Sequence, residues 1–192
     1  MRRITKVSAV LATAGIALTV GLTPASADVV DSTISGGTLT ATTSGATLTG
    51  VTLNGSNTQT STGNASSEWT ITDARGTGAA WALSVSATTP TSAAGTVELT
   101  ARTLPVSGLT IAPGTITAGA GSDAAATITA PELALSTSSQ ALVSTLGQNM
   151  GTYTLTPAFS LAIPANAFRS NYAVGTSGAL NPYTSTITYT IG

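Results

Sequence analysis

Short runs of alternating apolar and polar residues, separated by turn residues, recur along most of the chain. Clear examples are the segments 68–73 (EWTITD), 80–87 (AWALSVSA) and 183–192 (YTSTITYTIG). Successive side chains of a β-strand point to opposite faces, so this period of two predicts half-buried strands. The Gly, Asn, Pro and Ser residues between the runs fall at intervals typical of sandwiches. We therefore predict an all-β fold, an antiparallel β-sandwich of roughly eight to ten short strands. Further strands are predicted at 38–43, 46–55, 95–101, 124–130 and 152–164.

One segment has a different spacing. Leu142, Leu146 and Met150 are four residues apart, which would place them on one face of a helix. This predicts a short helix near 138–147, with a strand and loop as the alternative. The polar segment 56–67 (SNTQTSTGNASS) is interpreted as a connection between strands. Because no short repeat of fixed length is present, a β-helix is disfavoured.

The N-terminus has the three parts of a secretion signal. A basic start (MRRITK) precedes the apolar run VSAVLATAGIALTVGL, and the small residues Ala25-Ser26-Ala27 precede Asp28. This pattern predicts a signal peptide over 1–27 and a single mature domain over 28–192, with an N-terminal membrane anchor as the alternative. In the mature chain no apolar run approaches the roughly 18 residues needed to cross a bilayer, so no membrane span is expected there.

The composition excludes several classes of chemistry. The chain has no histidine and no cysteine, and Lys6 in the leader is its only lysine. A Ser-His-Asp triad, Schiff-base chemistry, disulfides and the commonest metal ligand are therefore missing, and we expect no cofactor and no metal site. After removal of the leader, three arginines face seven acidic residues. Such a negative chain lacks the clustered basic residues that nucleic acid binding requires.

The acidic residues leave two alternatives open. A hydrolase that works with two carboxylates would draw on Glu68, Asp73, Glu98 and Glu132, but these acids lack the aromatic platforms of sugar-binding sites. A calcium site would draw on Asp28, Asp31, Asp73 and Asp123, but the chain contains no calcium-loop motif. Scattered surface carboxylates are the simpler interpretation of both sets.

Both tryptophans lie within the segment 68–87, on either side of a glycine-containing turn. Trp69 begins one alternating run and Trp81 begins the next, with Leu83 on the same face as Trp81. In the turn, Asp73 can accept backbone N–H bonds, and Gly76 and Gly78 permit a positive φ. Arg75 is placed to pair with Asp73 or to lie over an indole.

Two segments carry a resemblance to a known family. The segment ITDARGTGAAWALSVSA, with the triplet Trp81-Ala82-Leu83, resembles the first motif of the WxL-domain surface proteins of Gram-positive bacteria. The segment YTSTITYTIG resembles their second motif: Tyr183, Thr188 and Thr190 match it, and Ile187 and Ile191 replace leucines. Tyr189 stands where the family has its second tryptophan, so this motif is degenerate. The resemblance covers most of 46–192.

The resemblance implies a secreted, non-catalytic domain that binds the cell wall without a covalent link. Peptidoglycan is the implied ligand, and other surface proteins are implied partners. The implied ligand-binding residues are Trp81, Leu83, Tyr189 and Ile191, and the residues that support the motifs and turns are Asp73, Arg75, Gly76, Gly78 and Tyr183.

Two questions follow from the motifs. Trp81 and Leu83 form either part of the core or a partly exposed platform. We also expect the segments 80–87 and 183–191 to lie near each other and to bring Trp81 and Tyr189 together. The alternative functions are a structural or adhesive subunit that presents a strand edge to partners, and, more remotely, a secreted carboxylate hydrolase.

Overall fold

A computed structural model describes residues 31–192 of the chain. Residues 35–192 form one compact unit, and the segment that ends at Ile34 is a separate one. The predicted signal peptide at 1–27 lies outside the described residues. Within residues 31–192, no helix is long and apolar enough to span a membrane.

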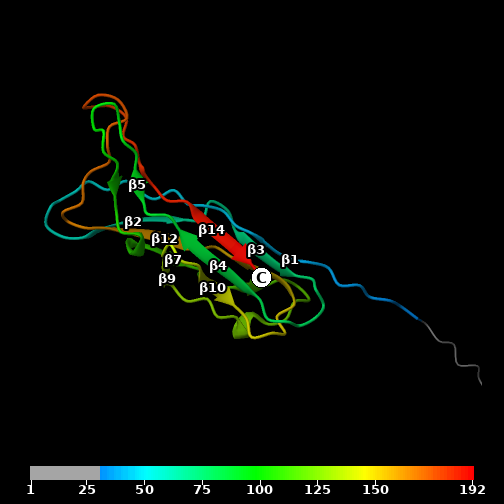
Figure 1. Cartoon of the computed structure of the whole chain (residues 1–192). Helices are drawn as coiled ribbons and strands as arrows, with labels where there is room; N and C mark the ends of the chain where they lie inside the picture. The colour runs from blue at the N-terminus through cyan, green and yellow to red at the C-terminus, as the bar shows by residue number, and fades with distance from the viewer. Residues whose placement is uncertain (1–30) are drawn as a thin grey trace, which may run out of the picture. The chain divides into compact units, whose positions relative to one another are not determined.

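Fourteen short strands make four antiparallel sheets within residues 35–192 (Figure 1). The first sheet has the order β1 (Leu39–Thr42), β3 (Trp69–Asp73), β11 (Gly151–Leu155), β8 (Thr117–Ala118). The second has the order β10 (Gln140–Ser144), β4 (Ala82–Ala87), β14 (Ile187–Ile191). The third has the order β2 (Gln59–Asn64), β12 (Ala158–Ile163), β7 (Leu109–Ala112), β9 (Leu133–Ala134). The fourth has the order β13 (Tyr183–Thr184), β5 (Thr91–Ser92), β6 (Arg102–Thr103), and two 3-10 turns are η1 (Val106–Gly108) and η2 (Ala125–Thr127).

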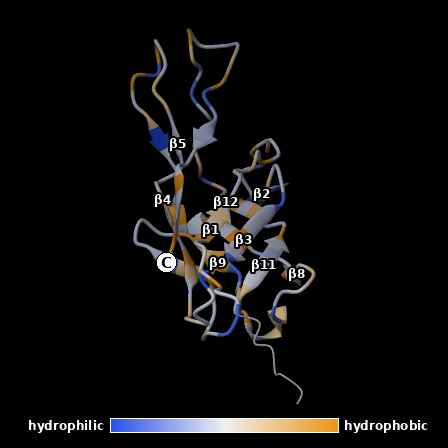
Figure 2. Cartoon of the chain, turned by 90° about the vertical axis from the view of Figure 1, so that its right-hand side faces the viewer, coloured by the Kyte–Doolittle hydropathy of each residue, from blue (hydrophilic) through white to orange (hydrophobic). Residues whose placement is uncertain are grey.

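The predicted all-β antiparallel fold is confirmed. There are more strands than predicted because several, such as β5 and β8, are only two residues long. Period-two patterning explains the longer strands: β3 and β4 each alternate buried with half-buried residues. The apolar residues gather inside the body of the sheets in Figure 2.

Trp69 joins the inward faces of three sheets into one core. It is fully buried on β3, and its ring meets Tyr189 of β14 edge-on, with centroids 4.8 Å apart. The ring of Phe159 on β12 lies 6.3 Å from it on the third sheet. Edge-to-face aromatic pairs at these separations stabilise a core beyond the area that they bury. Trp69 therefore lies at the centre of the core.

Several local predictions were wrong. The segment predicted as a short helix near 138–147 contains strand β10, so the alternative of strand and loop is correct there. Leu142 is fully buried whereas Leu146 is 98% exposed, so the two do not share one apolar face. The segment 56–67, interpreted as a connection, contains β2, and the buried hydroxyl of Ser61 bonds to the carbonyl of Thr49. The predicted strands at 46–55 and 95–101 are irregular chain outside the named strands.

Candidate binding site

The turn before Trp81 is held by an ion pair. Asp73, 2% exposed, accepts hydrogen bonds from Arg75 Nε (2.9 Å), Arg75 Nη2 (2.8 Å) and the Arg75 backbone N–H (3.0 Å). The Arg75 side chain lowers the pKa of Asp73 chiefly through these hydrogen bonds, so the buried carboxylate is ionised. Arg75 Nη2 also donates to the carbonyl of Ala79 (2.9 Å). The guanidinium therefore links both ends of the turn.

The two turn glycines have the predicted conformation. Gly76 and Gly78 have φ values of 69° and 64°, a region that residues with a Cβ enter at a cost. Gly78 also bonds to the next loop, because its carbonyl accepts the N–H of Gln148 (2.9 Å). These residues shape the approach to the first motif.

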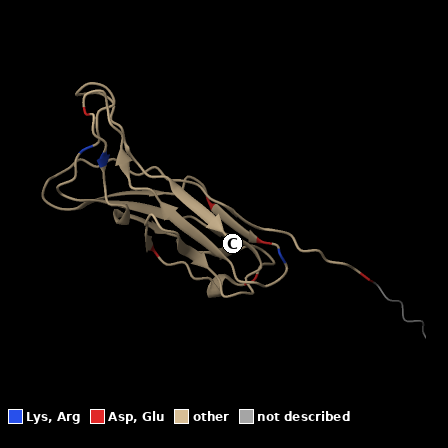
Figure 3. Cartoon of the chain, in the orientation of Figure 1, with Lys and Arg blue, Asp and Glu red and all other residues tan. Residues whose placement is uncertain are grey.

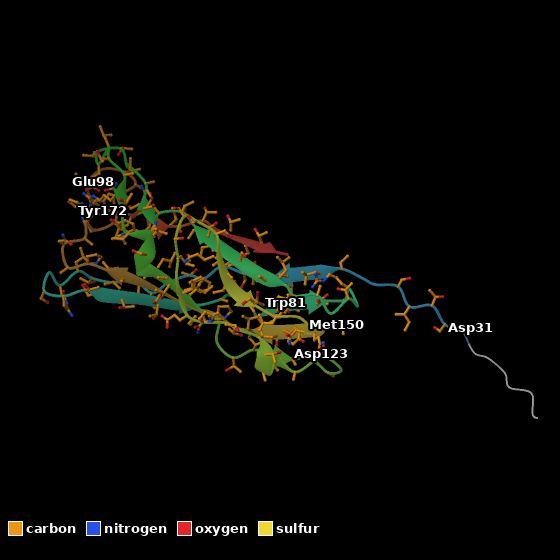
Figure 4. The ribbon with its side chains drawn as sticks, turned by 60° about the horizontal axis from the view of Figure 1, so that its bottom comes forward. Asp31, Trp81, Glu98, Asp123, Met150 and Tyr172 are labelled. Atoms are coloured by element: carbon orange, nitrogen blue, oxygen red, sulfur yellow. The ribbon has the colours of Figure 1, made fainter. Side chains whose placement is uncertain are left out.

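Trp81 and Leu83 lie in the core. Trp81 is 2% exposed and Leu83 is fully buried. The indole Nε1 of Trp81 donates to the carbonyl of Asn149 (3.0 Å), and the ring packs at 6.1 Å from Tyr153. Figure 4 shows Trp81 close to Met150 and Asp123, far from Glu98. Trp81 and Leu83 are therefore part of the core and do not form an exposed platform.

The two motif segments are neighbours, as expected. Strand β14 pairs with β4, with Tyr189 opposite Val85 and Ile191 opposite Leu83. The prediction that Trp81 and Tyr189 lie together is wrong. Tyr189 lies opposite Val85, which is four positions beyond Trp81, or about 13 Å along a strand. The ring of Tyr189 packs on Trp69 instead. Trp69 begins an alternating run in the sequence, and the structure places it on the inward face of β3.

An open groove of about 1310 Å³ lies beside the second motif. One side is the segment 43–53, and the other contains Tyr183, Ile187 and Tyr189. The lining that comes from the core is apolar: Leu104, Leu109, Phe159 and Leu161. Of the predicted site residues, Tyr183 and Tyr189 line this groove, and Trp81, Leu83, Ile191, Asp73, Arg75, Gly76 and Gly78 do not.

The two groove tyrosines differ in their hydroxyl groups. The Tyr183 hydroxyl donates to the carbonyl of Phe168 (2.9 Å), whereas the Tyr189 hydroxyl is buried without a partner. Burial raises the pKa of both phenols, so both are neutral at physiological pH. Their role in the groove is therefore packing and hydrogen bonding and not proton transfer.

The only charged side chains that line the groove are Arg102 and Arg169. Both bind Glu98, at 2.9 Å from Arg102 and 2.7 Å from Arg169. The pKa of Glu98 is lowered, first by the backbone N–H of Tyr172 and then by the Arg169 side chain, so the carboxylate is ionised. Two guanidinium groups share one carboxylate, and this cluster at the end of the groove keeps a net positive charge. Figure 4 shows Glu98 and Tyr172 side by side there.

An uncharged face of threonines lies on the first sheet. One row across the sheet contains Thr40, Thr72 and Thr152; the next contains Thr42, Thr70, Thr154 and Thr117. All seven are exposed or half-buried, and they alternate with buried residues such as Ile71 and Tyr153. The hydroxyls of Thr72 and Thr152 lie 3.2 Å apart. Charged residues are sparse over the whole described chain (Figure 3), so we call these seven positions the threonine face.

Several acidic residues named for the hydrolase and calcium alternatives have structural partners. Within residues 31–192 no three acidic residues are grouped so that they could hold a metal ion. Asp73 and Glu98 are ionised members of separate ion pairs. Asp123 accepts the backbone N–H of Met150 (2.8 Å), which is a structural contact. Asp73, Glu98 and Asp123 therefore have structural partners, and Asp28 lies outside the described residues.

The described residues define an all-β domain built from antiparallel sheets, with an open groove and a face of threonines. Comparison with protein families then gives the family. Residues 24–191 match the family described as WxL domain surface cell wall-binding, and the chain belongs to it. The match covers nearly the whole chain and confirms the resemblance carried by the two motifs. No curated protein matches the chain, and no solved structure does.

Proposed function

We propose that the chain is a secreted, non-catalytic domain that attaches to the Gram-positive cell wall by binding peptidoglycan. The observation that carries the proposal is the match of residues 24–191 to a family of surface cell-wall-binding domains. The secretion pattern at 1–27 and the absence of histidine, cysteine and mature lysine from the sequence support it. The domain would then comprise residues 28–192.

We propose that the motif residues have an indirect part in this function. Trp81 and Leu83 have no exposed surface on which a polymer could lie. We propose that they contribute to wall binding by holding β4 in place, and that Tyr189 and Ile191 hold the neighbouring strand β14. Asp73 and Arg75 contribute by fixing the turn before Trp81.

The threonine face is the surface that best suits a wall polysaccharide. Each hydroxyl offers one donor and two acceptors, and each methyl group offers apolar contact. Neighbouring strands are about 4.8 Å apart, so the seven side chains repeat at regular spacing across the sheet. Binding at uncharged positions avoids the cost of removing water from a charge. Each contact is weak, but the seven positions together would add up to stable binding.

The test is a pull-down of the exported protein on purified peptidoglycan sacculi. Replacing Thr70, Thr72, Thr152 and Thr154 by valine removes four hydroxyls from the face and keeps a good strand former at each position. We expect retention on sacculi to fall by about tenfold, which corresponds to roughly 1.4 kcal/mol. The matched control is T60V/T62V on the exposed side of β2, which should bind as the original chain does. Failure of the original chain to sediment with sacculi would refute the proposed function. Equal retention of the threonine-face variant and the control would refute the threonine face as the binding surface.

A second candidate function, a subunit of a surface assembly, is favoured by one observation. Strand β14 lies at the edge of its sheet, directly beside the apolar groove. An exposed strand edge beside apolar surface accepts strands from other chains. The next inference follows from this edge.

A further inference from the structure

The outer edge of β14 has backbone groups free to pair. Among the strands of residues 35–192, β14 has β4 as its only hydrogen-bonded neighbour. The ladder to β4 uses Thr186 and Gly192, whose backbone groups bond to Thr88 and Ala82. Bonding residues alternate along an antiparallel ladder. The N–H and C=O groups of Ile187, Tyr189 and Ile191 therefore point away from β4. Ile187 and Tyr189 line the groove, and β1 also approaches β14.

This unpaired edge borders the groove, and the groove suits an extended polypeptide. Ile187 and Tyr189 line one side, and the segment 43–53 lines the other with half-buried Leu48, Val51 and Leu53. The lining contains no Asn, Gln, Asp or Glu, the planar polar side chains with which proteins fix the hydroxyls of sugars. A strand added to an edge gains affinity from main-chain hydrogen bonds and specificity from pockets for alternate side chains. The groove has both features.

The chain itself contains a segment with matching chemistry. Residues 28–34 (DVVDSTI), which we call the arm, precede the compact unit that begins at Ser35. The arm has apolar residues at Val30 and Ile34, and the described part, 31–34, is exposed, with Ile34 94% exposed. Its two acids, Asp28 and Asp31, complement the only charges that line the groove, Arg102 and Arg169. Seven extended residues span about 23 Å, the same as the seven residues from Tyr183 to Tyr189.

Connectivity favours the arm of another molecule. The chain before β1 is fixed beside β3, where the Gly37 N–H donates to the carbonyl of Ala74 (2.7 Å). The groove lining begins at Thr43, beyond the other end of β1. An arm would have to reverse near Ser35 and run back along all of β1 to reach the groove of its own molecule. A second copy requires no reversal.

We propose that the arm of one copy, residues 28–34, binds in the groove of a second copy as a strand added to β14. Such a contact is head-to-tail, because the arm and the groove are different surfaces of the same chain. Head-to-tail contacts form chains of molecules when the geometry does not close into a ring. This inference goes beyond wall attachment. It rests on the proposed function only for secretion, in which signal cleavage would make Asp28 the first residue of the arm.

The experiment measures the mass of the exported full-length product by light scattering over a range of concentrations. The arm variant is Ile34→Asp, at an exposed position where the fold loses no buried contact. The groove variant is Gly50→Trp, since a Cβ at Gly50 meets nothing within 4 Å and the ring would occupy the groove. The matched control is Gly50→Ala. We expect concentration-dependent association of the original chain and of Gly50→Ala, weaker by about tenfold or more in each of the other two variants.

Mixing the two defective variants gives the decisive result. Ile34→Asp keeps a working groove and Gly50→Trp keeps a working arm, so the mixture should form a one-to-one pair although each alone is monomeric. The synthetic peptide DVVDSTISG should bind the Ile34→Asp chain, and a scrambled peptide should not. A monomeric original chain, association that survives Gly50→Trp, or a mixture that stays monomeric would overturn the proposal. Both variants should still sediment with sacculi, so failure of wall binding is separable from failure of the arm contact.

Discussion

The burial of Trp81 makes a quantitative prediction about the first motif. Trp81→Ala removes an indole that is 2% exposed, packs on Tyr153 and donates to the carbonyl of Asn149. Large-to-small substitution of a buried aromatic residue costs about 3–5 kcal/mol. Single domains have total stabilities of about 5–15 kcal/mol. The variant should therefore lose about a fifth or more of its free energy of unfolding.

Trp81→Phe separates the hydrogen bond from the packing. The phenyl ring keeps most of the apolar contact but leaves the Asn149 carbonyl without its buried donor. An unsatisfied buried polar group costs about 1–3 kcal/mol, so Trp81→Phe should lie between the original chain and Trp81→Ala, at about 2 kcal/mol. Leu146→Ala is the matched control, because Leu146 is 98% exposed and surface changes usually stay within about 0.5 kcal/mol.

Urea unfolding followed by the fluorescence of Trp69 and by circular dichroism measures all three variants. The slope of the free energy against urea should stay constant while the midpoint falls. An unchanged midpoint in Trp81→Ala, together with lost sedimentation on sacculi, would refute the core assignment. Such a result would mean that the indole contacts the wall directly.

The remaining predictions concern the turn, acid stability and one close backbone approach. Arg75→Gln leaves the buried Asp73 carboxylate without its guanidinium. Loss of one partner of such a pair should lower the free energy of unfolding by about 3 kcal/mol in urea titrations. An effect below that of Leu146→Ala would contradict the role given to the ion pair. The lowered pKa of Asp73 means that its stabilising effect is full above the pKa of the unfolded chain and is lost as pH falls through the lower folded-state pKa. Melting temperatures measured below about pH 4 should thus fall more steeply in the original chain than in Asp73→Asn, and parallel curves would count against this. A Cβ at Gly63 would collide with the backbone carbonyl of Thr47, whereas one at Gly45 meets nothing within 4 Å, so calorimetry should show Gly63→Ala clearly destabilised and Gly45→Ala nearly unchanged.

The sequence predicted the fold class because the long strands obey one simple rule. In β3 and β4 every second residue is buried, and alternation placed Trp81 and Leu83 on one face without deciding whether that face is core or an exposed platform. Alternation failed at 95–101, where Val97 and Leu99 are 56% and 77% exposed because no sheet covers them. It missed β2, whose centre is the polar Ser61, buried by a hydrogen bond and not by apolar packing. The alternation of apolar and polar residues shows which runs could form strands, but the available pairing partners decide which of them do.

The candidate site was harder to predict than the fold. Local chemistry gave the Asp73–Arg75 pair as one of two alternatives for Arg75 and predicted the positive φ of Gly76 and Gly78, because all four residues lie within one turn. The groove is built from segments far apart in the sequence, such as 43–53, Phe159 and Tyr189. The pair of Trp69 with Tyr189 likewise depends on how the sheets face each other. A single sequence does not specify these long-range distances.

The pairing of β4 with β14 has a consequence for when the chain can fold. Thr88 and Thr186, which bond across this ladder, are 98 positions apart. Contacts of such long range form late, since the loop between them must close first. A chain that is threaded through a secretion channel from its N-terminus cannot complete this sheet until nearly all of it has passed. For the export proposed above, this topology predicts that the sheet of β10, β4 and β14 is completed only after nearly all of the chain has left the cell.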